Sequence, residues 1–297
     1  MSSSGFWELA VGVSADLSEG LTNLVWELGA LGVVEEEQPG QGARLRAFFP
    51  GTIFASALEA QVRAYLDGLR ELGFEPPTDV SVVALADENW ADAWRAHFTP
   101  RLVGRRLLIL PPWEQPAANG RIVITIDPGR AFGTGHHGST IGCLEALESV
   151  IERDRPSGMI DLGTGSGILA IAAARLGVRA VLAVDDDPDA VAAAVANVAR
   201  NHVADRIRCA LADAARFDEA PAPLVVANLL SAAHRRLGAQ YARALRPGGT
   251  LLLGGILDGE GSDVTAALGD HGFVPRESLS VEGWTTLELR APLHDHA

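Results

Sequence analysis

Two spacings of apolar side chains alternate along the first 86 residues. Bulky apolar residues at every second position predict strands, and apolar residues three or four positions apart predict helices. The resulting order, strand–helix–strand–strand–helix–strand, predicts a small ferredoxin-like α+β domain over residues 1–86. Ser18 is expected to cap the first helix. The predicted strands are residues 6–13, 32–37, 43–49 and 79–86, and the predicted helices are residues 18–30 and 54–72.

Residues 87–129 are expected to link this domain to the rest of the chain. Their first part, ENWADAWRAHF, has a helical pattern that places Trp90, Trp94 and Phe98 on one stripe. We interpret the stripe as packing between domains, and an aromatic patch that grips a substrate is the alternative. Short strands are expected around residues 106–110 and 121–126.

From residue 140 onward, helical and strand patterns alternate. This alternation predicts a mostly parallel seven-stranded sheet with helices on both faces, a Rossmann-like domain of residues 130–297. Ligands of such sheets bind at the carboxyl ends of the strands. One of the helices is expected over residues 232–245. The expected strands are GMIDLG, AVLAVD, RIRCALAD, PLVVANLL, TLLLGGIL and a final pair that ends near Arg290.

Composition and charge limit the class of protein. Hydrophobic residues make up 47% and charged residues 21% of the 297 positions, which is typical of a folded chain. The formal net charge of −14 repels phosphate backbones, so we expect no direct nucleic-acid binding. Residues 1–86 contain four arginines and twelve acidic residues, which would attract a basic protein instead.

Other features indicate a cytoplasmic protein without membrane contact. No apolar run in the sequence approaches the roughly 20 residues that cross a bilayer, and the first residues lack the basic segment of a signal peptide. Cys143 and Cys209 form no metal or redox pattern and are expected to be free thiols. All 24 basic residues are arginines, so the chain contains no lysine.

A glycine-rich loop from Asp161 to Gly167 (DLGTGSG) lies between a predicted strand and a predicted helix. Glycines permit a tight turn and close approach of a ligand, which makes Gly163 and Gly165 candidate cofactor-binding residues. The spacing differs from that of dinucleotide enzymes and of the P-loop. Asp161 would repel a pyrophosphate but suits a ligand with a cationic amino-acid end. A structural turn is the alternative.

Asp185 is the last residue of AVLAVD, 22 residues after Gly163. An acid at the end of this second strand can accept hydrogen bonds from both ribose hydroxyls of a nucleoside. The glycine loop and this acid together therefore indicate a nucleoside-containing ligand. We interpret Asp186 and Asp187 as solvated, and an ordinary charged loop is the alternative for Asp185 itself.

Asn228 ends the predicted fourth strand of this domain. In class I methyltransferases the residue at this position faces the transferred methyl group, and an asparagine carbonyl there can accept a hydrogen bond from a target amine. Leu229, Leu230 and Ser231 follow, whereas enzymes that methylate nucleobase amines usually have two prolines and an aromatic residue that stacks on the base. A nucleobase substrate is therefore disfavoured. An asparagine that ends a strand for reasons of turn geometry is the alternative.

Residues 127–140 (DPGRAFGTGHHGST) form a glycine-rich approach to the first predicted helix of this domain, which their polar end can cap. Adjacent histidines such as His136 and His137 rarely chelate one ion, and no acidic or cysteine partner lies at ligand spacing, so we expect no metal. No other general base is obvious nearby, so His137 is a candidate catalytic residue.

Taken together, residues 127–140, the glycine loop, AVDDDPDAV and VVANLL resemble the PrmA family, the methyltransferases of large-subunit ribosomal protein eleven. The resemblance extends over essentially the whole chain, including the segment ENWADAWRAHFTP and the Gly-Trp-Thr before the last strand. It implies a class I methyltransferase that uses S-adenosylmethionine. The family's cofactor-binding positions correspond to Thr140, Gly163, Asp185 and Asn228.

The resemblance also implies a substrate: lysine side-chain and α-amino groups of that basic ribosomal protein, methylated more than once. Departures from the family pattern are mild, with Gly138-Ser139 in place of a bulkier residue and a threonine, and Leu229 in place of an isoleucine. A methyltransferase for a lysine of a different protein is an alternative. A non-catalytic cofactor-binding module is another, disfavoured by the intact Asn228 and the additional domain.

Overall fold

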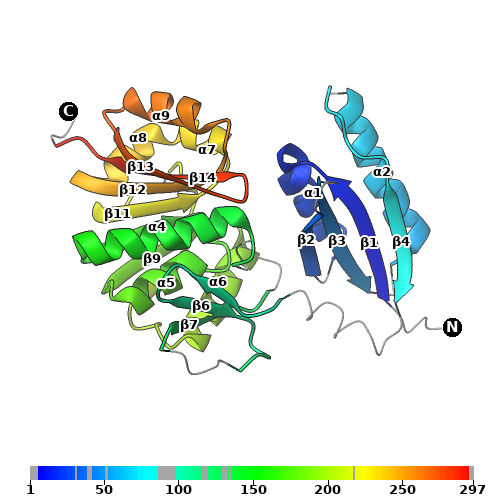
Figure 1. Ribbon diagram of the computed structural model, residues 1–297, viewed down its shortest axis with the longest axis horizontal. Coiled ribbons are helices and arrows are strands. Elements are labelled where there is room, and N and C mark those ends of the chain that lie inside the picture. The colour runs from blue at the N-terminus through cyan, green and yellow to red at the C-terminus, as the bar shows by residue number, and fades with distance from the viewer. Residues whose placement is uncertain are drawn as a thin grey trace. The chain divides into compact units, whose positions relative to one another are not determined.

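The computed structural model shows two compact units, Met1–Thr99 and Pro100–Ala297, which we describe separately (Figure 1). Of the predicted aromatic stripe, Trp90 and Trp94 lie outside the described residues, whereas Phe98 is buried. No helix within the described part of the chain is long and apolar enough to cross a membrane. The described residues are 6–30, 32–38, 42–50, 53–71, 73–85, 98–115, 120–128, 133, 135–216 and 218–293.

The first unit has the predicted order of strands and helices. Its four described strands form a sheet in the order β2-β3-β1-β4, and every neighbouring pair is antiparallel. This is the ferredoxin-like topology, so the predicted fold class is confirmed for this unit. The elements are β1 (Phe6–Val13), α1 (Ala15–Glu27), β2 (Gly32–Gln38), β3 (Gly42–Pro50), α2 (Ala55–Glu71) and β4 (Val80–Leu85).

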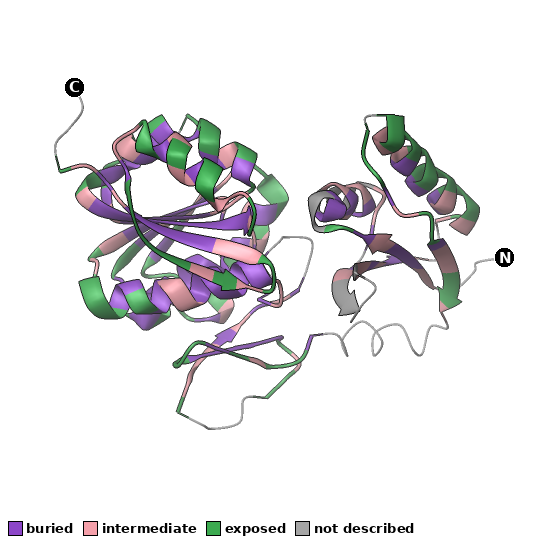
Figure 2. Cartoon of the chain, turned by 45° about the horizontal axis from the view of Figure 1, so that its top comes forward, coloured by how far each residue is buried: buried purple, intermediate pink, exposed green. Residues whose placement is uncertain are grey.

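The core of the first unit lies between its sheet and its helices. Leu9, Val11 and Val13 of β1 are buried in one cluster with Leu21 of α1 and Leu58 of α2 (Figure 2). The three β1 residues occupy alternate positions and therefore share one face of the sheet. Both described helices of the unit pack on that face.

The first helix begins earlier than predicted. α1 starts at Ala15, and the carbonyl oxygen of Ser14 accepts hydrogen bonds from the N–H groups of Leu17 and Ser18, each at 3.0 Å. Ser18 is therefore a buried residue of the first turn and not the cap. The prediction is wrong because Ser14, directly after β1, already supplies the first accepting carbonyl.

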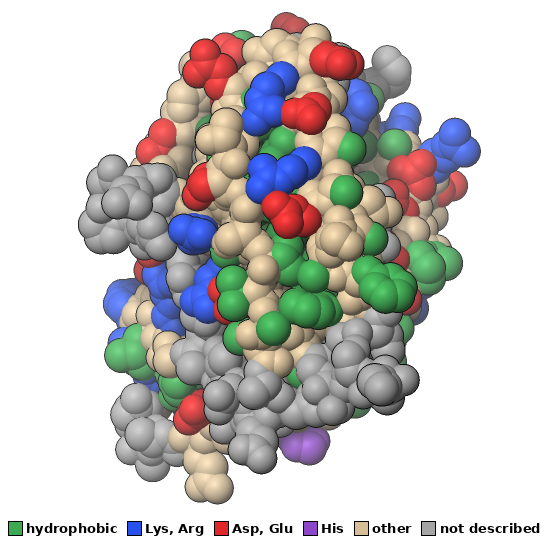
Figure 3. Space-filling view, turned by 90° about the vertical axis from the view of Figure 1, so that its right-hand side faces the viewer, with side chains coloured by type: hydrophobic (Ala, Val, Ile, Leu, Met, Phe, Trp, Pro, Cys, Tyr) green, Lys and Arg blue, Asp and Glu red, His purple; other side chains and the backbone are tan. Residues whose placement is uncertain are grey.

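Acidic and basic side chains are paired along α2. The Glu59 carboxylate accepts a hydrogen bond from Arg63 at 2.7 Å, and Asp67 pairs with Arg70 further along the helix. Figure 3 shows acidic side chains lying next to basic ones on one face of the molecule. Exposed pairs of this kind stabilise a fold by only about 0–1 kcal/mol.

The second unit is built on the predicted sheet. Over the described residues, seven strands lie in the order β10-β9-β8-β11-β12-β14-β13. Neighbours from β10 to β12 are parallel, and β14 is antiparallel to both β12 and β13, so the mostly parallel Rossmann-like class is confirmed. The strands are β8 (Gly158–Leu162), β9 (Ala180–Asp185), β10 (Ile207–Leu211), β11 (Ala222–Asn228), β12 (Leu245–Leu257), β13 (Val274–Val281) and β14 (Trp284–Arg290).

Helices cover both faces of this sheet (Figure 1). Met159, Val181 and Leu224 are buried on the face that packs against α4, α5 and α6. Ile160 and Val225, one position further along their strands, are buried on the face that packs against α7, α8 and α9. The helices are α4 (Gly138–Asp154), α5 (Ile168–Leu176), α6 (Pro188–Arg200), α7 (Ser231–Arg236), α8 (Gly238–Ala244) and α9 (Gly261–Gly269).

The segment 232–245, predicted as one helix, contains a break. α7 ends at Arg236 and α8 begins at Gly238, with Leu237 between them. A β-carbon at Gly238 would lie only 2.2 Å from Cδ2 of His271, so the glycine permits a close approach of that ring. The apolar spacing continues through the break, which is why periodicity alone predicts a single helix.

A second sheet, with three described strands, belongs to the same unit. In the order β5-β6-β7, the first pair is antiparallel and the second is parallel. Val103, Leu107 and Ile124 of this sheet are buried in one cluster with residues of α4 and α5. The sequence pattern predicts β6 and β7 but misses β5, whose three residues are too few to show a period. The strands are β5 (Arg101–Val103), β6 (Leu107–Leu110) and β7 (Ile122–Thr125).

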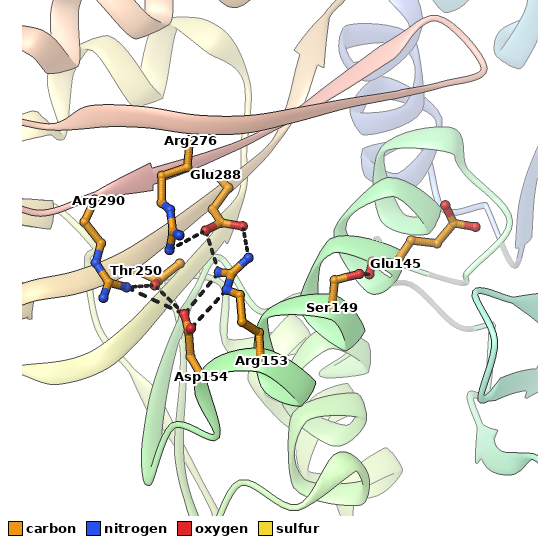
Figure 4. Close-up of polar contacts among 8 residues, drawn as sticks. All are labelled: Glu145, Ser149, Arg153, Asp154, Thr250, Arg276, Glu288 and Arg290. Carbon is orange, nitrogen blue, oxygen red and sulfur yellow. Dashed lines mark hydrogen bonds and ion pairs between the residues drawn. The ribbon is translucent and has the colours of Figure 1, made fainter.

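An ionic cluster joins the end of α4 to the antiparallel edge of the large sheet (Figure 4). The buried carboxylate of Glu288 accepts two hydrogen bonds from the guanidinium group of Arg153, at 2.6 and 3.2 Å. Arg153 also pairs with Asp154, which lies 3.6 Å from Arg290, and Arg276 approaches Glu288 to 3.5 Å. Hydrogen bonds to Asp154 and Glu288 raise the pKa of Arg153, so Glu288 keeps a permanent counter-charge.

Glu148 joins α4 to the turn between β5 and β6. Its side chain is buried, and its Oε2 accepts hydrogen bonds from the backbone N–H groups of Arg105 and Arg106, each at 3.2 Å. Gly104 in this turn has a φ of +52°, and a β-carbon there would lie 2.5 Å from the same oxygen. The carboxylate therefore fixes the small sheet against α4, the helix that also carries Thr140.

We expect Glu148→Ala to lower the free energy of unfolding by about 2–3 kcal/mol, because two backbone N–H groups lose their hydrogen-bond acceptor. Glu152→Ala is the matched control, since Glu152 is exposed on the same helix and pairs with Arg105 at the surface. Its loss should be about 0–1 kcal/mol. Urea denaturation measures both values, and equal losses would show that the turn does not depend on Glu148.

Candidate active site

The glycine loop follows β8 in a conformation that favours glycine. Gly163, Gly165 and Gly167 have φ values of +71°, +54° and +82°, all in the left-handed region. The N–H groups of Gly163 and Thr164 both donate to the carbonyl oxygen of Val184 at 2.9 Å, which turns the loop over the end of β9. The backbone of the loop therefore requires glycine at the positions that the sequence identifies.

Asp185, at the end of β9, is bound to this loop. Its Oδ2 accepts a hydrogen bond from the N–H of Gly165 at 2.8 Å, and its Oδ1 accepts one from the N–H of Asp187 at 3.1 Å. Burial raises the pKa of Asp185, and the two hydrogen bonds partly offset that effect. Asp187, which we predicted to be solvated, caps α6 by accepting a hydrogen bond from the N–H of Asp189 at 2.8 Å.

Asp161 is fully buried at the start of the loop. Its Oδ2 accepts hydrogen bonds from the hydroxyl of Thr164 at 2.7 Å and the N–H of Ala170 at 3.2 Å. Its Oδ1 has no hydrogen-bond partner among the described residues. Burial raises the pKa of Asp161 to about 7. A cation placed at the unpartnered oxygen would favour the ionised form.

Asn228 lies where β11 ends. Its Nδ2 donates to the hydroxyl of Ser139 at 3.3 Å and to the hydroxyl of Thr140 at 3.4 Å, both in the first turn of α4. Its Oδ1 is buried and has no partner within the part of the chain that the structure describes. The two hydroxyls thus orient the amide and leave its accepting oxygen without a partner among the described residues.

His137 is connected to this group through Ser139. Its Nδ1 lies 2.8 Å from the Ser139 hydroxyl, and its ring centroid lies 4.6 Å from that of Trp284 on β14. Burial lowers the pKa of His137 to about 4, and the charge of Glu282 opposes the effect in part. The imidazole is therefore neutral at physiological pH.

The strand ends that carry these groups are neighbours, because β8 pairs with β9 on one side and with β11 on the other. Leu229, the residue after Asn228, packs so closely on Gly163 that a β-carbon there would lie 2.5 Å from its Cδ2. Asp185, the glycine loop and Asn228 therefore gather at one edge of the sheet, where parallel sheets bind their ligands.

This edge is held in place by buried polar side chains that the sequence pattern does not reveal. Asn197 of α6 is buried, donates to the carbonyl oxygen of Ser166 at 3.0 Å and accepts a hydrogen bond from the N–H of Asp127 at 3.1 Å. The hydroxyl of Ser166 donates to the carbonyl oxygen of Gly133 at 2.6 Å. Together they tie the glycine loop to the segment before α4. The sequence signal that could have indicated this role is an asparagine on the buried face of an alanine-rich helix.

Metal and thiol chemistry find no support in the described residues. Within them, no group of three or more His, Cys, Asp or Glu side chains is arranged to hold a metal ion. Both Cys143 and Cys209 are free. Burial raises the pKa of Cys143 to about 12 and also raises the pKa of Cys209, so both thiols are protonated at neutral pH.

The buried carboxylate predicts a pH dependence that Asp161→Asn should remove. The folded-state pKa of about 7 lies above the ordinary 3.8, so this group lowers the stability of the parent as pH rises from about 4 to 7. The effect is at most roughly 4 kcal/mol. Urea denaturation from about pH 5 to 8 should show the variant gaining stability relative to the parent. A constant difference between Asp161→Asn and the parent across this range would contradict the prediction.

Comparison with known proteins places this chain in a family. The sequence model described as ribosomal protein L11 methyltransferase (PrmA) matches residues 5–292. The ribosomal protein L11 methyltransferase of Trichlorobacter lovleyi is 35% identical over 306 residues, with 96% of this chain and 98% of the relative covered. That of Desulfitobacterium hafniense is 36% identical over 305 residues, with 95% and 97% covered. The crystal structure of ribosomal protein L11 methylase from Lactobacillus delbrueckii subsp. bulgaricus matches with a TM-score of 0.61 and 30% identity, over 66% of this chain and 100% of that one. The chain therefore belongs to the PrmA family of ribosomal protein L11 methyltransferases.

Proposed function

We propose that this protein transfers methyl groups from S-adenosylmethionine to lysine side-chain and/or α-amino groups of ribosomal protein L11. Family membership establishes the S-adenosylmethionine-dependent methyltransferase class, which confirms the cofactor and the family expected from the sequence. One observation carries the proposal further: Oδ1 of Asn228 is buried and lacks a partner among the described residues. Buried acceptors are normally satisfied, and the N–H of a substrate amine would satisfy this one.

The proposed cofactor site follows the strand ends. Each carboxylate oxygen of Asp185 accepts one backbone hydrogen bond and keeps a lone pair for a ribose hydroxyl. Gly163 makes room for Leu229, Gly165 allows close approach of the ligand, and the unpartnered Oδ1 of Asp161 suits its cationic amino-acid end. Thr140, held next to the amide of Asn228, is proposed to complete the set.

The cofactor supplies an electrophilic methyl group bound to a sulfonium sulfur. When the methyl group is transferred, that sulfur leaves as a neutral thioether. The chain must therefore position and desolvate a neutral amine. At pH 7, deprotonation costs roughly 4.6 kcal/mol for a lysine of pKa about 10.4, and about 1 kcal/mol for an α-amine of pKa about 7.7. An apolar approach to the site would lower either value.

Asn228 is proposed to aim the amine. Its Oδ1 accepts one N–H while Ser139 and Thr140 hold its Nδ2, so the nitrogen lone pair is directed at the methyl group. His137 is a weak base for an ammonium proton, because burial lowers its pKa to about 4. Its proposed contribution is therefore to hold Ser139, and the proton of the amine leaves to solvent before transfer.

The first unit is proposed to hold the substrate. Residues 1–86 carry four arginines against twelve acidic residues. Ribosomal proteins that bind RNA are basic, so the sign of the field fits. A modifier of such a protein would act in the cytoplasm. The attraction involves exposed charges and should weaken as salt is added.

Incubation with labelled S-adenosylmethionine and purified ribosomal proteins tests the proposal. Label on L11 supports it. Label only on a lysine of another protein would mean that the substrate is that protein, while the proposed reaction stays the same. Absence of label on every ribosomal protein would leave a cofactor-binding module as the better description.

Asp185→Ala is expected to impair cofactor binding, and Asn228→Ala is expected to impair turnover. Loss of Asp185 removes charge-assisted hydrogen bonds to the ribose, each worth roughly 1.5–3 kcal/mol, and should raise the calorimetric Kd for the cofactor. Loss of Asn228 should leave that Kd nearly unchanged and lower kcat by about 10²–10³, since the lost group acts on the nucleophile. An unchanged kcat would make Asn228 structural only, and an unchanged Kd would remove the ribose role of Asp185.

A protein covering residues 100–297 is expected to bind the cofactor as well as the parent but to methylate L11 poorly. The start at Pro100 keeps Val103, Leu107 and Ile109, which are buried in the core of the second unit. The defect should appear as a raised KM for L11 that added salt no longer changes, because the acidic unit is missing. Full efficiency on intact L11 would refute the recognition role of the first unit.

A further inference from the structure

His234 is a buried histidine that the proposed reaction does not use. It lies on α7, shortly after Asn228, and its side chain is 0% exposed. Its Nδ1 lies 2.8 Å from the Tyr241 hydroxyl, and its Nε2 lies 2.8 Å from the carbonyl oxygen of Gly254. A carbonyl can only accept, so Nε2 carries the proton and Nδ1 accepts the hydrogen bond from Tyr241.

The side chains around His234 are mostly apolar, and the backbone of Leu229 is a further polar neighbour of the ring. Leu237, Tyr241 and Leu253 belong to the cluster buried on this face of the sheet. Burial lowers the pKa of His234 to about 4, so the ring is neutral and keeps one tautomer. Apolar side chains alone could pack α7 on the sheet, whereas a satisfied polar network selects one arrangement of its members. The hydrogen bond to Gly254 therefore indicates a role for His234 beyond packing.

The carbonyl that His234 holds lies next to Asn228. Gly254 and Asn228 are partners in the parallel pairing of β11 with β12. The N–H of Leu229 also donates to the carbonyl oxygen of Gly254, at 3.2 Å. Two donors thus fix this oxygen, one from the backbone after Asn228 and one from His234.

Gly254 and Gly255 line the accepting end of Asn228. A β-carbon would lie 3.0 Å from Asn228 Oδ1 if built on Gly254, and 3.1 Å from it if built on Gly255. Gly255 has a φ of +74°, and the register of β12 with β14 shifts between Leu253 and Ile256. The strand is irregular at this point, so ladder pairing on that side does not fix the two glycines.

We infer that His234 is a positioning residue for methyl transfer: it holds the Gly254 carbonyl and thereby keeps this irregular stretch in the conformation that leaves Asn228 Oδ1 open to an amine. Tyr241 acts through His234 by fixing its tautomer. The inference rests on the proposed function, which gives the oxygen of Asn228 its role.

Three variants test the inference in the full-length enzyme with S-adenosylmethionine and L11. His234→Phe keeps a ring but loses both hydrogen bonds, and kcat should fall by roughly tenfold or more, while KM for L11 and Kd for the cofactor change by less than about threefold. His234→Gln can still donate to Gly254 and should recover kcat to within about fivefold of the parent. Tyr241→Phe removes only a hydroxyl and should lower kcat by about two- to fivefold.

Leu268→Ala is the matched control, because Leu268 is fully buried in the same cluster and has no polar contact with Gly254. It should destabilise the fold as much as His234→Phe does and leave kcat within about threefold below its unfolding temperature. A second measurement needs no turnover. Amide hydrogen exchange at Leu229 should be roughly tenfold faster in His234→Phe, with exchange at Val225 of the same strand unchanged.

The outcomes separate the inference from the proposed function. A parent-like kcat and unchanged exchange at Leu229 in His234→Phe would overturn the inference while leaving L11 methylation intact. An equal loss of kcat in Leu268→Ala would show that His234 only stabilises the fold, and this result would also overturn the inference. If the parent failed to methylate L11, the proposed function would fail, and the exchange measurement would still decide whether His234 holds the strand beside Asn228.

Discussion

The close approach of β11 to the loop after β8 is the constraint on which the rest of the site depends. It exists because residue 163 has no side chain, so Leu229 occupies the space that a β-carbon would need. The same loop reaches the neighbouring strand through the N–H of Gly165 and the carboxylate of Asp185. Three strand ends are thus coupled through contacts of Gly163 and Gly165, whose φ values are +71° and +54°. A side chain at either position would strain the backbone and separate the groups that the chemistry brings together.

The carboxylates of this edge differ from that of Glu288 in the ionic cluster. Glu288 is buried among the cationic side chains of arginines. Within the described residues, Asp161 and Asp185 accept hydrogen bonds only from neutral donors, which are backbone N–H groups and a hydroxyl. Burial raises the pKa of both aspartates, so their ionised forms are less stable than those of exposed acids. A ligand that carries positive charge would offset this penalty on binding. The site is therefore electrostatically incomplete in a way that favours a cationic cofactor over a phosphorylated one.

Periodicity predicts the order of elements well, because apolar spacing reports which face of each element is buried. It fails in two places: β5 is too short for a period, and the apolar spacing continues through the break at Leu237, where Gly238 lies against His271 of another segment. The gathering of Asp185, the glycine loop and Asn228 could be predicted, since parallel strand ends meet at one edge. The hydrogen bonds from Asn228 to Ser139 and from Asn197 to Ser166 join residues far apart in sequence, and no local spacing encodes them.

Every basic residue of the ionic cluster at the end of α4 is an arginine, in a chain that contains no lysine. A guanidinium group has a planar fork that can bridge Asp154 and Glu288 at once, as Arg153 does, and a single ammonium group would do this less well. A guanidinium group also remains protonated at every physiological pH and offers no free lone pair to an electrophile. An enzyme proposed to methylate lysine amines thus builds its own scaffold from cations that cannot compete with its substrate, and no side chain of the chain can become an ε-amine acceptor for its own reaction.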